Sequence, residues 1–257
     1  MPAFKRSLLG FARANQATSV WIDRLLLPDR LRQDGNKTFQ SEVLPQHVSN
    51  RMNVYDLGGG SQPYFSPSQK ASLGLHVTGL DISAEELEAS PEGGYDRKIV
   101  ADLCTFRGTE DADLIVCQAT LEHVPNVAGA IRAIAETLAP GGKAVLFLPC
   151  RNAVFARLNL LLPETLKKRL LFALFPHKAE GHDGFKAYYD RCTPFDIADL
   201  ARQNGLDVQE QRLFWISSYF MIFTPAFLLW RLYQGLAYLI MREQAAETFT
   251  VVLQKPQ

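Results

Sequence analysis

The chain has 257 residues, of which 47% are hydrophobic and 21% charged, values that are typical of a folded globular protein and exclude a disordered one. Its 27 basic residues equal its 27 acidic residues, so no overall positive charge attracts it to nucleic acid. The four cysteines are widely spaced without a C-x-x-C pair, which argues against a zinc cluster or a disulfide framework. Cys117 and Cys150 lie in apolar runs and are expected to be buried free thiols, as in a cytoplasmic protein.

Residues 1–50 form a leading segment before the regular pattern of the chain begins. Within it, residues 5–27 are predicted to be an amphipathic helix that ends near Pro28. Arg13 and Asn15 interrupt the apolar run of this segment, which is therefore too short and too polar for a secretory signal.

Residues 51–150 alternate between short apolar runs and a helical pattern. The helical pattern covers 127–138, where apolar residues recur every three or four positions. Such alternation predicts βαβ units and a mostly parallel sheet, in which ligands bind beyond the carboxyl ends of the strands. The runs predicted as strands are 52–57, 75–80, 98–101, 113–118 and 143–148.

Glycines and acidic residues stand at the ends of the first three predicted strands. The first strand leads into Asp56-Leu57-Gly58-Gly59-Gly60, and glycine lets a ligand approach the main chain closely. Asp81 ends the second strand, where a carboxylate can accept hydrogen bonds from both hydroxyls of an adenosine ribose. Asp102 ends the third strand beside Leu103, where it is expected to face the adenine.

Two adenosine cofactors compete for this rim of the sheet. A nicotinamide dinucleotide requires a third glycine and a helix N-terminus for its pyrophosphate, but Ser61-Gln62-Pro63 supplies neither. S-adenosylmethionine has no phosphate and carries a charged amino-acid tail, with which an acidic residue such as Asp56 is compatible. The pattern therefore favours S-adenosylmethionine and leaves a nicotinamide-dependent oxidoreductase as an alternative.

Several motifs in the same order over residues 51–150 resemble those of the class I S-adenosylmethionine-dependent methyltransferases, a broad group that includes ubiquinone-biosynthesis and sugar O-methyltransferases. The resemblance implies an α/β fold, with a Rossmann-like, seven-stranded, mostly parallel sheet, a C-terminal antiparallel strand and helical insertions. Gln62 departs from the family pattern, in which many members have a third glycine. The motifs are Val54-Tyr55-Asp56-Leu57-Gly58-Gly59-Gly60, Gly79-Leu80-Asp81-Ile82-Ser83, Ala101-Asp102-Leu103, Asp113-Leu114-Ile115-Val116-Cys117-Gln118 with Leu121-Glu122-His123-Val124, and Leu138-Ala139-Pro140-Gly141-Gly142-Lys143.

The same resemblance implies roles for single residues. Gly58 and Gly60 are expected against the methionyl part of the cofactor, with Asp56 close to its amino group. The other cofactor-binding residues that it implies are Asp81 at the ribose with its neighbour Ile82, Asp102 and Leu103 at the adenine, and Gln118 near the methyl group.

Methyl transfer to a hydroxyl group requires that a proton be removed, and His123 after the fourth strand is the candidate general base. A role in ordering its loop is the alternative. The irregular residues 151–192 contain His177, His182 and Asp183, which we interpret as part of a cap that binds the acceptor. Their spacing is a poor metal-ligand signature, and no metal is expected.

The predicted strands 206–214 and 247–253 enclose a very apolar stretch. Residues 213–230 carry no charge and approach the length of a membrane span. Because these two strands pair in one sheet of the implied fold, and because Pro225 interrupts the stretch, we expect a helical insertion over 215–246. It either packs on the leading helix or a second subunit, or makes peripheral membrane contact through 213–241, where Trp and Tyr are favoured.

Together these features predict one methyltransferase domain over 51–257, with the cap insertion 151–192 and the apolar insertion 215–246. The favoured reaction is O-methylation of a small-molecule acceptor of saccharide or lipid type, in the cytoplasm or at the inner face of a membrane. Besides the oxidoreductase, a non-catalytic, membrane-associated module that keeps a cofactor pocket is an alternative.

Overall fold

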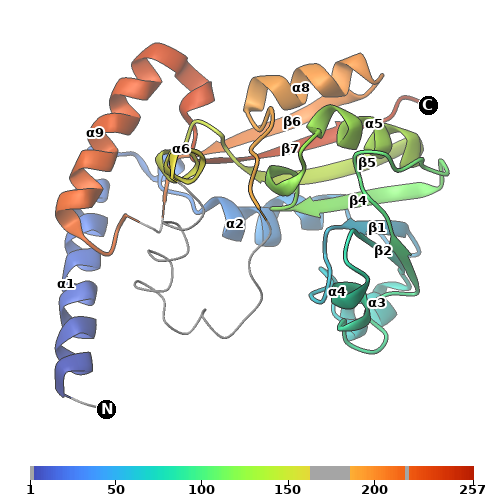
Figure 1. The fold of residues 1–257 in the computed structure, drawn as a ribbon, viewed down its shortest axis with the longest axis horizontal. Coiled ribbons are helices and arrows are strands. Elements are labelled where there is room, and N and C mark those ends of the chain that lie inside the picture. Colours follow the sequence, from blue (N-terminus) through green and yellow to red (C-terminus); the bar gives the residue numbers. More distant parts are fainter. Residues whose placement is uncertain (1–2, 163–185, 218–219) are drawn as a thin grey trace.

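A computed structural model describes residues 3–162, 186–217 and 220–257. The described chain folds around one seven-stranded sheet with the order β3-β2-β1-β4-β5-β7-β6, in which β7 runs antiparallel to both β5 and β6 (Figure 1). The predicted α/β fold and the predicted strands are therefore confirmed. The strands are β1 (Asn53–Leu57), β2 (His76–Asp81), β3 (Arg97–Val100), β4 (Ala112–Gln118), β5 (Leu138–Pro149), β6 (Asp207–Phe214) and β7 (Thr248–Gln254).

Helices cover both faces of this sheet. The longer ones are α1 (Ala3–Leu26), α3 (Pro67–Leu73), α5 (Val127–Thr137), α6 (Val154–Leu161), α8 (Pro194–Gln203) and α9 (Thr224–Met241). The shorter ones are η1 (Asp29–Leu31), α2 (Gly35–Thr38), the π-helix η2 (Phe39–Val43), η3 (Leu44–His47), α4 (Ala84–Glu88), η4 (Leu121–His123) and η6 (Arg242–Ala245).

The central strands are apolar on both faces because each face packs against helices. In β4, Ile115 and Cys117 point into the core that α5 and α8 cover. Leu114 and Val116 point into the opposite core, which the short helices η2, η3 and α4 help to close. This arrangement explains why the central strands appear in the sequence as continuous apolar runs rather than alternating ones.

All four cysteines are buried and free, as expected for Cys117 and Cys150. Burial raises the pKa of the Cys150 thiol to about 12. The pKa of Cys117 and of Cys192 is also raised, in both cases chiefly by burial.

The apolar helix α9 packs against the leading helix α1, and the two lie along one flank of the molecule (Figure 1). Pro225 lies in the first turn of α9, where its missing N–H has no partner to lose, so it begins this helix rather than interrupting it. Among the residues that the structure describes, no helix is both long enough and apolar enough to cross a membrane.

A buried ion pair joins the two helices. The carboxylate of Asp23 accepts two hydrogen bonds from Arg231, at 2.7 Å from Nε and 2.6 Å from Nη2, and both side chains are almost fully buried. The main-chain N–H of Thr224 also donates to the side chain of Asn15 at 3.0 Å. On the inner side of α9, Trp230 donates to the Glu247 carboxylate at 2.8 Å, which ties the helix to the start of β7.

Loss of one partner of the Asp23–Arg231 pair should destabilise the protein strongly, because the other charge stays buried without compensation. We expect Asp23→Ala to lower the free energy of unfolding in urea by about 3 kcal/mol. The double variant Asp23→Leu/Arg231→Leu should lose less, since it removes both charges. The matched control is Asp29→Ala, which removes an exposed carboxylate and should cost about 1 kcal/mol or less. An equal loss in Asp23→Ala and the control would contradict this account.

Candidate functional site

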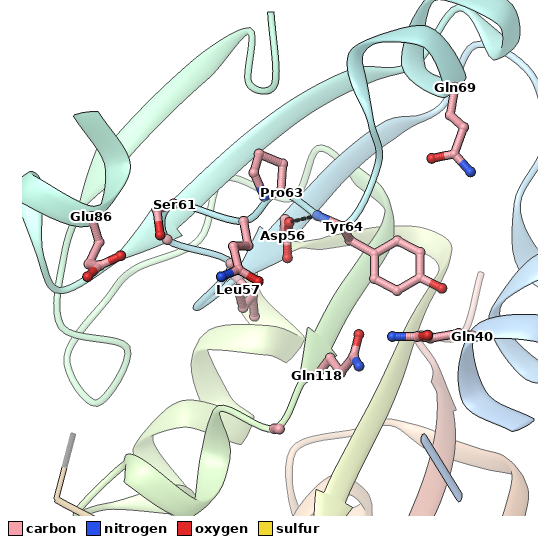
Figure 2. A pocket seen from close by; sticks show the side chains of 13 residues that line it. Gln40, Asp56, Leu57, Ser61, Pro63, Tyr64, Gln69, Glu86 and Gln118 are labelled. Atoms are coloured by element: carbon pink, nitrogen blue, oxygen red, sulfur yellow. Dashed lines mark hydrogen bonds between the residues drawn. The ribbon is translucent and has the colours of Figure 1, made fainter. Parts of the chain in front are cut away.

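A cavity of about 690 Å³ lies beyond the carboxyl ends of β1 and β4 (Figure 2). Its volume is within the range of roughly 300–1,000 Å³ that is usual for small-molecule sites, and its position is that expected for ligands of an open α/β sheet. The lining comes from the end of β1 and the loop after it, the end of β4, and the helices η2, α3 and α4. The residues are Gln40, Asp56, Leu57, Gly59, Gly60, Ser61, Gln62, Pro63, Tyr64, Gln69, Glu86, Gln118 and Ala119.

Two glycines shape the loop after β1. Gly58 has a positive φ of 75°, and a Cβ atom there would overlap the side chain of Thr120. Gly60 has a φ of 50°, and a Cβ atom there would lie 3.3 Å from Oδ2 of Asp81. The loop therefore brings bare main chain close to the end of β2 on one side and to the start of η4 on the other.

Asp56 is a buried carboxyl group in the cavity wall. Its Oδ2 accepts hydrogen bonds from the main-chain N–H of Tyr64 at 2.7 Å and from the hydroxyl of Tyr95 at 3.4 Å. The pKa of Asp56 is raised to about 6, chiefly by burial and to a smaller extent by the charge of Asp81, against the lowering effect of the two hydrogen bonds. A cation bound in the cavity next to Asp56 would therefore lower the pKa of this carboxyl group and favour its ionised form.

The end of the cavity near Ser61 is acidic. Glu86 points into this end from α4 (Figure 2). Asp81 lies behind Gly60 and does not line the cavity itself; its Oδ1 accepts a hydrogen bond from the main-chain N–H of Ser83 at 2.9 Å. Ser83 in turn caps α4 by accepting from the N–H of Glu86, so the two carboxylates are placed by one short turn.

The other end of the cavity carries uncharged hydrogen-bonding groups. Gln40, Tyr64 and Gln118 gather there, on the far side of Asp56 from Glu86 (Figure 2). The side chain of Gln118 donates to Asn36 at 2.6 Å, which links the end of β4 to the leading segment.

Two unusual backbone conformations lie at this uncharged end. Gln40 belongs to the π-helix η2, a conformation often found at functional sites. Ala119, directly after β4, has a positive φ of 53°, which is unfavourable for a residue with a side chain. Such strain persists only where the surrounding structure enforces it, and here it turns the chain sharply at the cavity.

The cavity brings together only part of the predicted site. Asp56, Gly60 and Gln118 line it, and Gly58 and Asp81 adjoin it. Four other predicted residues are not in its lining: Ile82 is exposed, Asp102 accepts from the N–H of Cys104, Leu103 is buried, and His123 lies on η4.

Several lining residues were missed from the sequence. Ser83-x-x-Glu86 is a helix-capping pattern directly after β2, and it could have indicated Glu86. No comparable signal marks Gln40, because its place depends on Phe39, whose ring packs 6.0 Å from that of Tyr64 and 5.6 Å from that of Phe147.

The helix η4 fixes the end of the predicted cap. The carbonyl of Glu122 accepts from the main-chain N–H groups of Tyr188 at 2.7 Å and Tyr189 at 3.0 Å. Nδ1 of His123 lies 3.2 Å from the carbonyl oxygen of Lys186. Burial raises the pKa of Glu122 to about 8.

The other cap residues predicted to bind the acceptor, His177, His182 and Asp183, lie outside the described residues. Within the part of the chain that is described, no group of three or more His, Cys, Asp or Glu side chains is arranged to hold a metal ion.

Solved structures of methyltransferases share this fold. A Mesorhizobium loti S-adenosylmethionine-dependent methyltransferase superposes with a TM-score of 0.54 and 16% identity, over 86% of this chain and 100% of that chain. Haemonchus contortus phosphoethanolamine N-methyltransferase 2, in complex with S-adenosyl-L-methionine, superposes with a TM-score of 0.53 and 15% identity, over 85% of this chain and 52% of that one.

Sequence comparisons point to the same group. The ubiquinone biosynthesis O-methyltransferase of Cupriavidus pinatubonensis is 28% identical over 166 residues, which are 62% of this chain and 61% of the relative. That of Xanthomonas oryzae is 31% identical over 165 residues, 61% of this chain and 63% of the relative, so the match spans about three fifths of these relatives. A family model described as a methyltransferase domain matches residues 17–211. The chain therefore belongs to the methyltransferase domain family, and its fold is that of the class I S-adenosylmethionine-dependent methyltransferases.

Proposed function

We propose that this methyltransferase methylates a hydroxyl oxygen of a saccharide- or lipid-type acceptor. The observation that carries the proposal is the uncharged end of the cavity, where Gln40, Tyr64 and Gln118 offer amide and phenol groups to a hydroxylated molecule. The relatives named ubiquinone biosynthesis O-methyltransferase support oxygen as the methylated atom.

The cofactor end of the cavity suits S-adenosylmethionine. The loop glycines leave room for a ligand against the main chain, and the buried Asp56 favours a positively charged amino group. The first helix after the loop, α3, begins only at Pro67, so no helix N-terminus follows the glycines to receive a pyrophosphate. S-adenosylmethionine supplies the methyl group on a sulfonium centre that a nucleophile attacks in line.

In this proposal one end of the cavity binds the cofactor and the other end binds the acceptor. Asp56, Gly58 and Gly60 hold the methionyl part, and Gln118 lies near the methyl group, where it helps to align the acceptor. The residues assigned to the adenosine are Asp81 with Ile82 at the ribose, and Asp102 with Leu103 at the adenine.

His123 is proposed as the general base that accepts the proton of the hydroxyl. It follows β4 on η4, and its Nδ1 is within hydrogen-bond distance of the Lys186 carbonyl. When Nδ1 donates to that carbonyl, the imidazole takes the tautomer in which Nε2 is the proton acceptor. The hydrogen bond to the Lys186 carbonyl thus leaves Nε2 of His123 able to accept a proton. The alternative role of His123, ordering the cap, uses the same hydrogen bond.

The same proposal assigns a role to each segment of the chain. Residues 51–257 are assigned to the methyltransferase domain after a leading segment over 1–50, and the insertion 151–192 is assigned to binding the acceptor, with its residues 163–185 outside the described part of the chain. The apolar insertion 215–246 places the enzyme at the inner face of a membrane, through peripheral contact by residues 213–241. Its exposed leucines and aromatic rings support this position.

Asp81→Ala should abolish binding of S-adenosylhomocysteine, because it removes the proposed acceptor for the ribose hydroxyls. In calorimetric titration we expect the wild type to bind in the micromolar range, on the order of −8 kcal/mol. The matched control is Asp207→Ala, which removes an exposed carboxylate at the start of β6 and should bind as the wild type does. Wild-type affinity in Asp81→Ala would exclude the ribose contact, and no binding in the wild type would contradict the proposed cofactor site.

The affinity for S-adenosylhomocysteine should rise with pH. Below its pKa of about 6, Asp56 is protonated in the free protein, and an ammonium group must displace that proton to bind beside the carboxylate. We expect the affinity to increase about tenfold between pH 5 and pH 7 and then to level off. Asp56→Asn should bind more weakly and show little change over the same range. A flat profile in the wild type would argue against contact between Asp56 and the amino group.

Methyl transfer itself should depend on His123. With radiolabelled cofactor and extracts of membranes and glycans, we expect label in a methyl ether, identified by mass spectrometry. Loss of a general base lowers a rate by about 100- to 10,000-fold, so His123→Gln should reduce kcat while leaving the affinity for S-adenosylhomocysteine unchanged. Glutamine keeps a donor for the Lys186 carbonyl; full activity in this variant would assign His123 to ordering the cap.

A further inference from the structure

The outer face of α9 is apolar where a helix that faces water is normally charged. Leu229, Leu232, Leu236, Leu239 and Ile240 follow one another at helical spacing, and their exposure ranges from 53% at Leu236 to 83% at Ile240. The one charged residue of α9, Arg231, is held in the buried pair with Asp23. The exposed face of α9 is therefore a stripe of leucine and isoleucine side chains that contains no charged residue.

The outer face of α1 combines large apolar side chains with positive charge. Trp21 is 60% exposed and Leu25 is 65% exposed, and the side chains of Arg13 and Arg24 are exposed as well. The helix contains Lys5, Arg6, Arg13 and Arg24 against a single acidic residue, Asp23, whose carboxylate is neutralised by Arg231. The charge that α1 carries beyond this ion pair is thus entirely positive.

We propose that α1 and α9 together form one surface that binds an anionic lipid bilayer, with the apolar stripe in the interface and Arg13 and Arg24 of α1 on the lipid headgroups. The proposal rests on the peripheral membrane contact proposed for residues 213–241, and it adds the second helix and the preference for negative charge. Charge complementarity selects the occupant: positive side chains beside exposed leucine and tryptophan match the headgroup and acyl layers of such a bilayer.

The buried contacts between the helices make this surface rigid. The Asp23–Arg231 pair and the bond from Thr224 to Asn15 hold α1 on α9, and the bond from Trp230 to Glu247 holds α9 on the sheet. The arrowhead of β4, whose end lines the cavity, points toward the flank that carries the two helices (Figure 1). Binding of the flank to a membrane therefore fixes how the cavity faces that membrane.

Flotation with lipid vesicles tests the headgroup preference. The full chain should bind vesicles of phosphatidylcholine with 30–40% phosphatidylglycerol at least tenfold more tightly than vesicles of phosphatidylcholine alone, and added salt should weaken the binding. Arg13→Glu/Arg24→Glu should lose this preference. The matched control is Arg202→Glu, which reverses an exposed charge on α8 and should bind as the wild type does.

Tryptophan fluorescence with brominated lipids tests which face inserts. The test uses a Trp215→Phe background, because Trp215 is half-buried against Tyr238 of α9. In this background the exposed Trp21 should be quenched by anionic vesicles that carry brominated acyl chains, whereas the buried Trp230 is shielded, so Trp21→Phe should remove most of the quenching. Leu229→Asp/Leu239→Asp should abolish binding. Calorimetric titration of each variant with S-adenosylhomocysteine serves as the test of folding, because none of these positions lines the cavity.

The outcomes separate this inference from the proposed function. Equal binding to neutral and anionic vesicles that survives Arg13→Glu/Arg24→Glu would overturn the role of α1 and leave contact through 213–241 intact. Absence of binding to both kinds of vesicle would overturn both claims about the membrane, as would a stable dimer in solution that shields Trp21 from a soluble quencher. Methyl transfer to an acceptor dissolved in detergent needs no membrane, so this assay tests the proposed reaction independently of the vesicle experiments.

Discussion

The cavity depends on the absence of a side chain at Gly58. A Cβ atom at this position would overlap Thr120, and the positive φ of the residue is one that few other residues tolerate. Only because the chain can turn here does Gly60 come against Asp81, and only then does Asp56 lie behind the loop with its carboxyl group out of water. A short loop between β1 and α3 thereby determines the shape of the cavity, how near Asp81 lies to it, and how readily the carboxyl group of Asp56 takes up a charge.

This geometry joins two chemically different environments within one cavity. On one side are the carboxyl groups of Asp56 and Glu86, with that of Asp81 behind the loop; on the other are amides and a phenol that the leading segment and the end of β4 bring together. The first environment suits a cation with sugar hydroxyls, and the second suits a neutral acceptor. In the proposed reaction the methyl group passes between them, near Gln118 and Ala119, where the chain leaves the sheet with a positive φ.

The sequence predicted the sheet well because its evidence is local. Each central strand is a short apolar run that is buried on two faces. The end of such a run marks the end of the strand, and for β2 it predicts the position of Asp81. The start of β5 was less well predicted: Pro140, Gly141 and Gly142 indicate a turn, but Leu138 already pairs with Ala112 beyond a register shift. Gln40 could not be predicted, since its place depends on rings that meet from three separate parts of the chain. For the same reason, the contact of Asp23 with Arg231, 208 positions apart, is visible only in the folded molecule.

The buried thiols have a consequence for the lifetime of the enzyme. Attack by an oxidant or an alkylating reagent requires a thiolate, and burial raises the pKa of Cys117, Cys150 and Cys192, so almost no thiolate forms while the core is closed. Chemical damage at these positions must then wait until the core opens, as happens when the protein unfolds. The rate at which these cysteines are modified therefore reports how often the sheet separates from the helices that cover it.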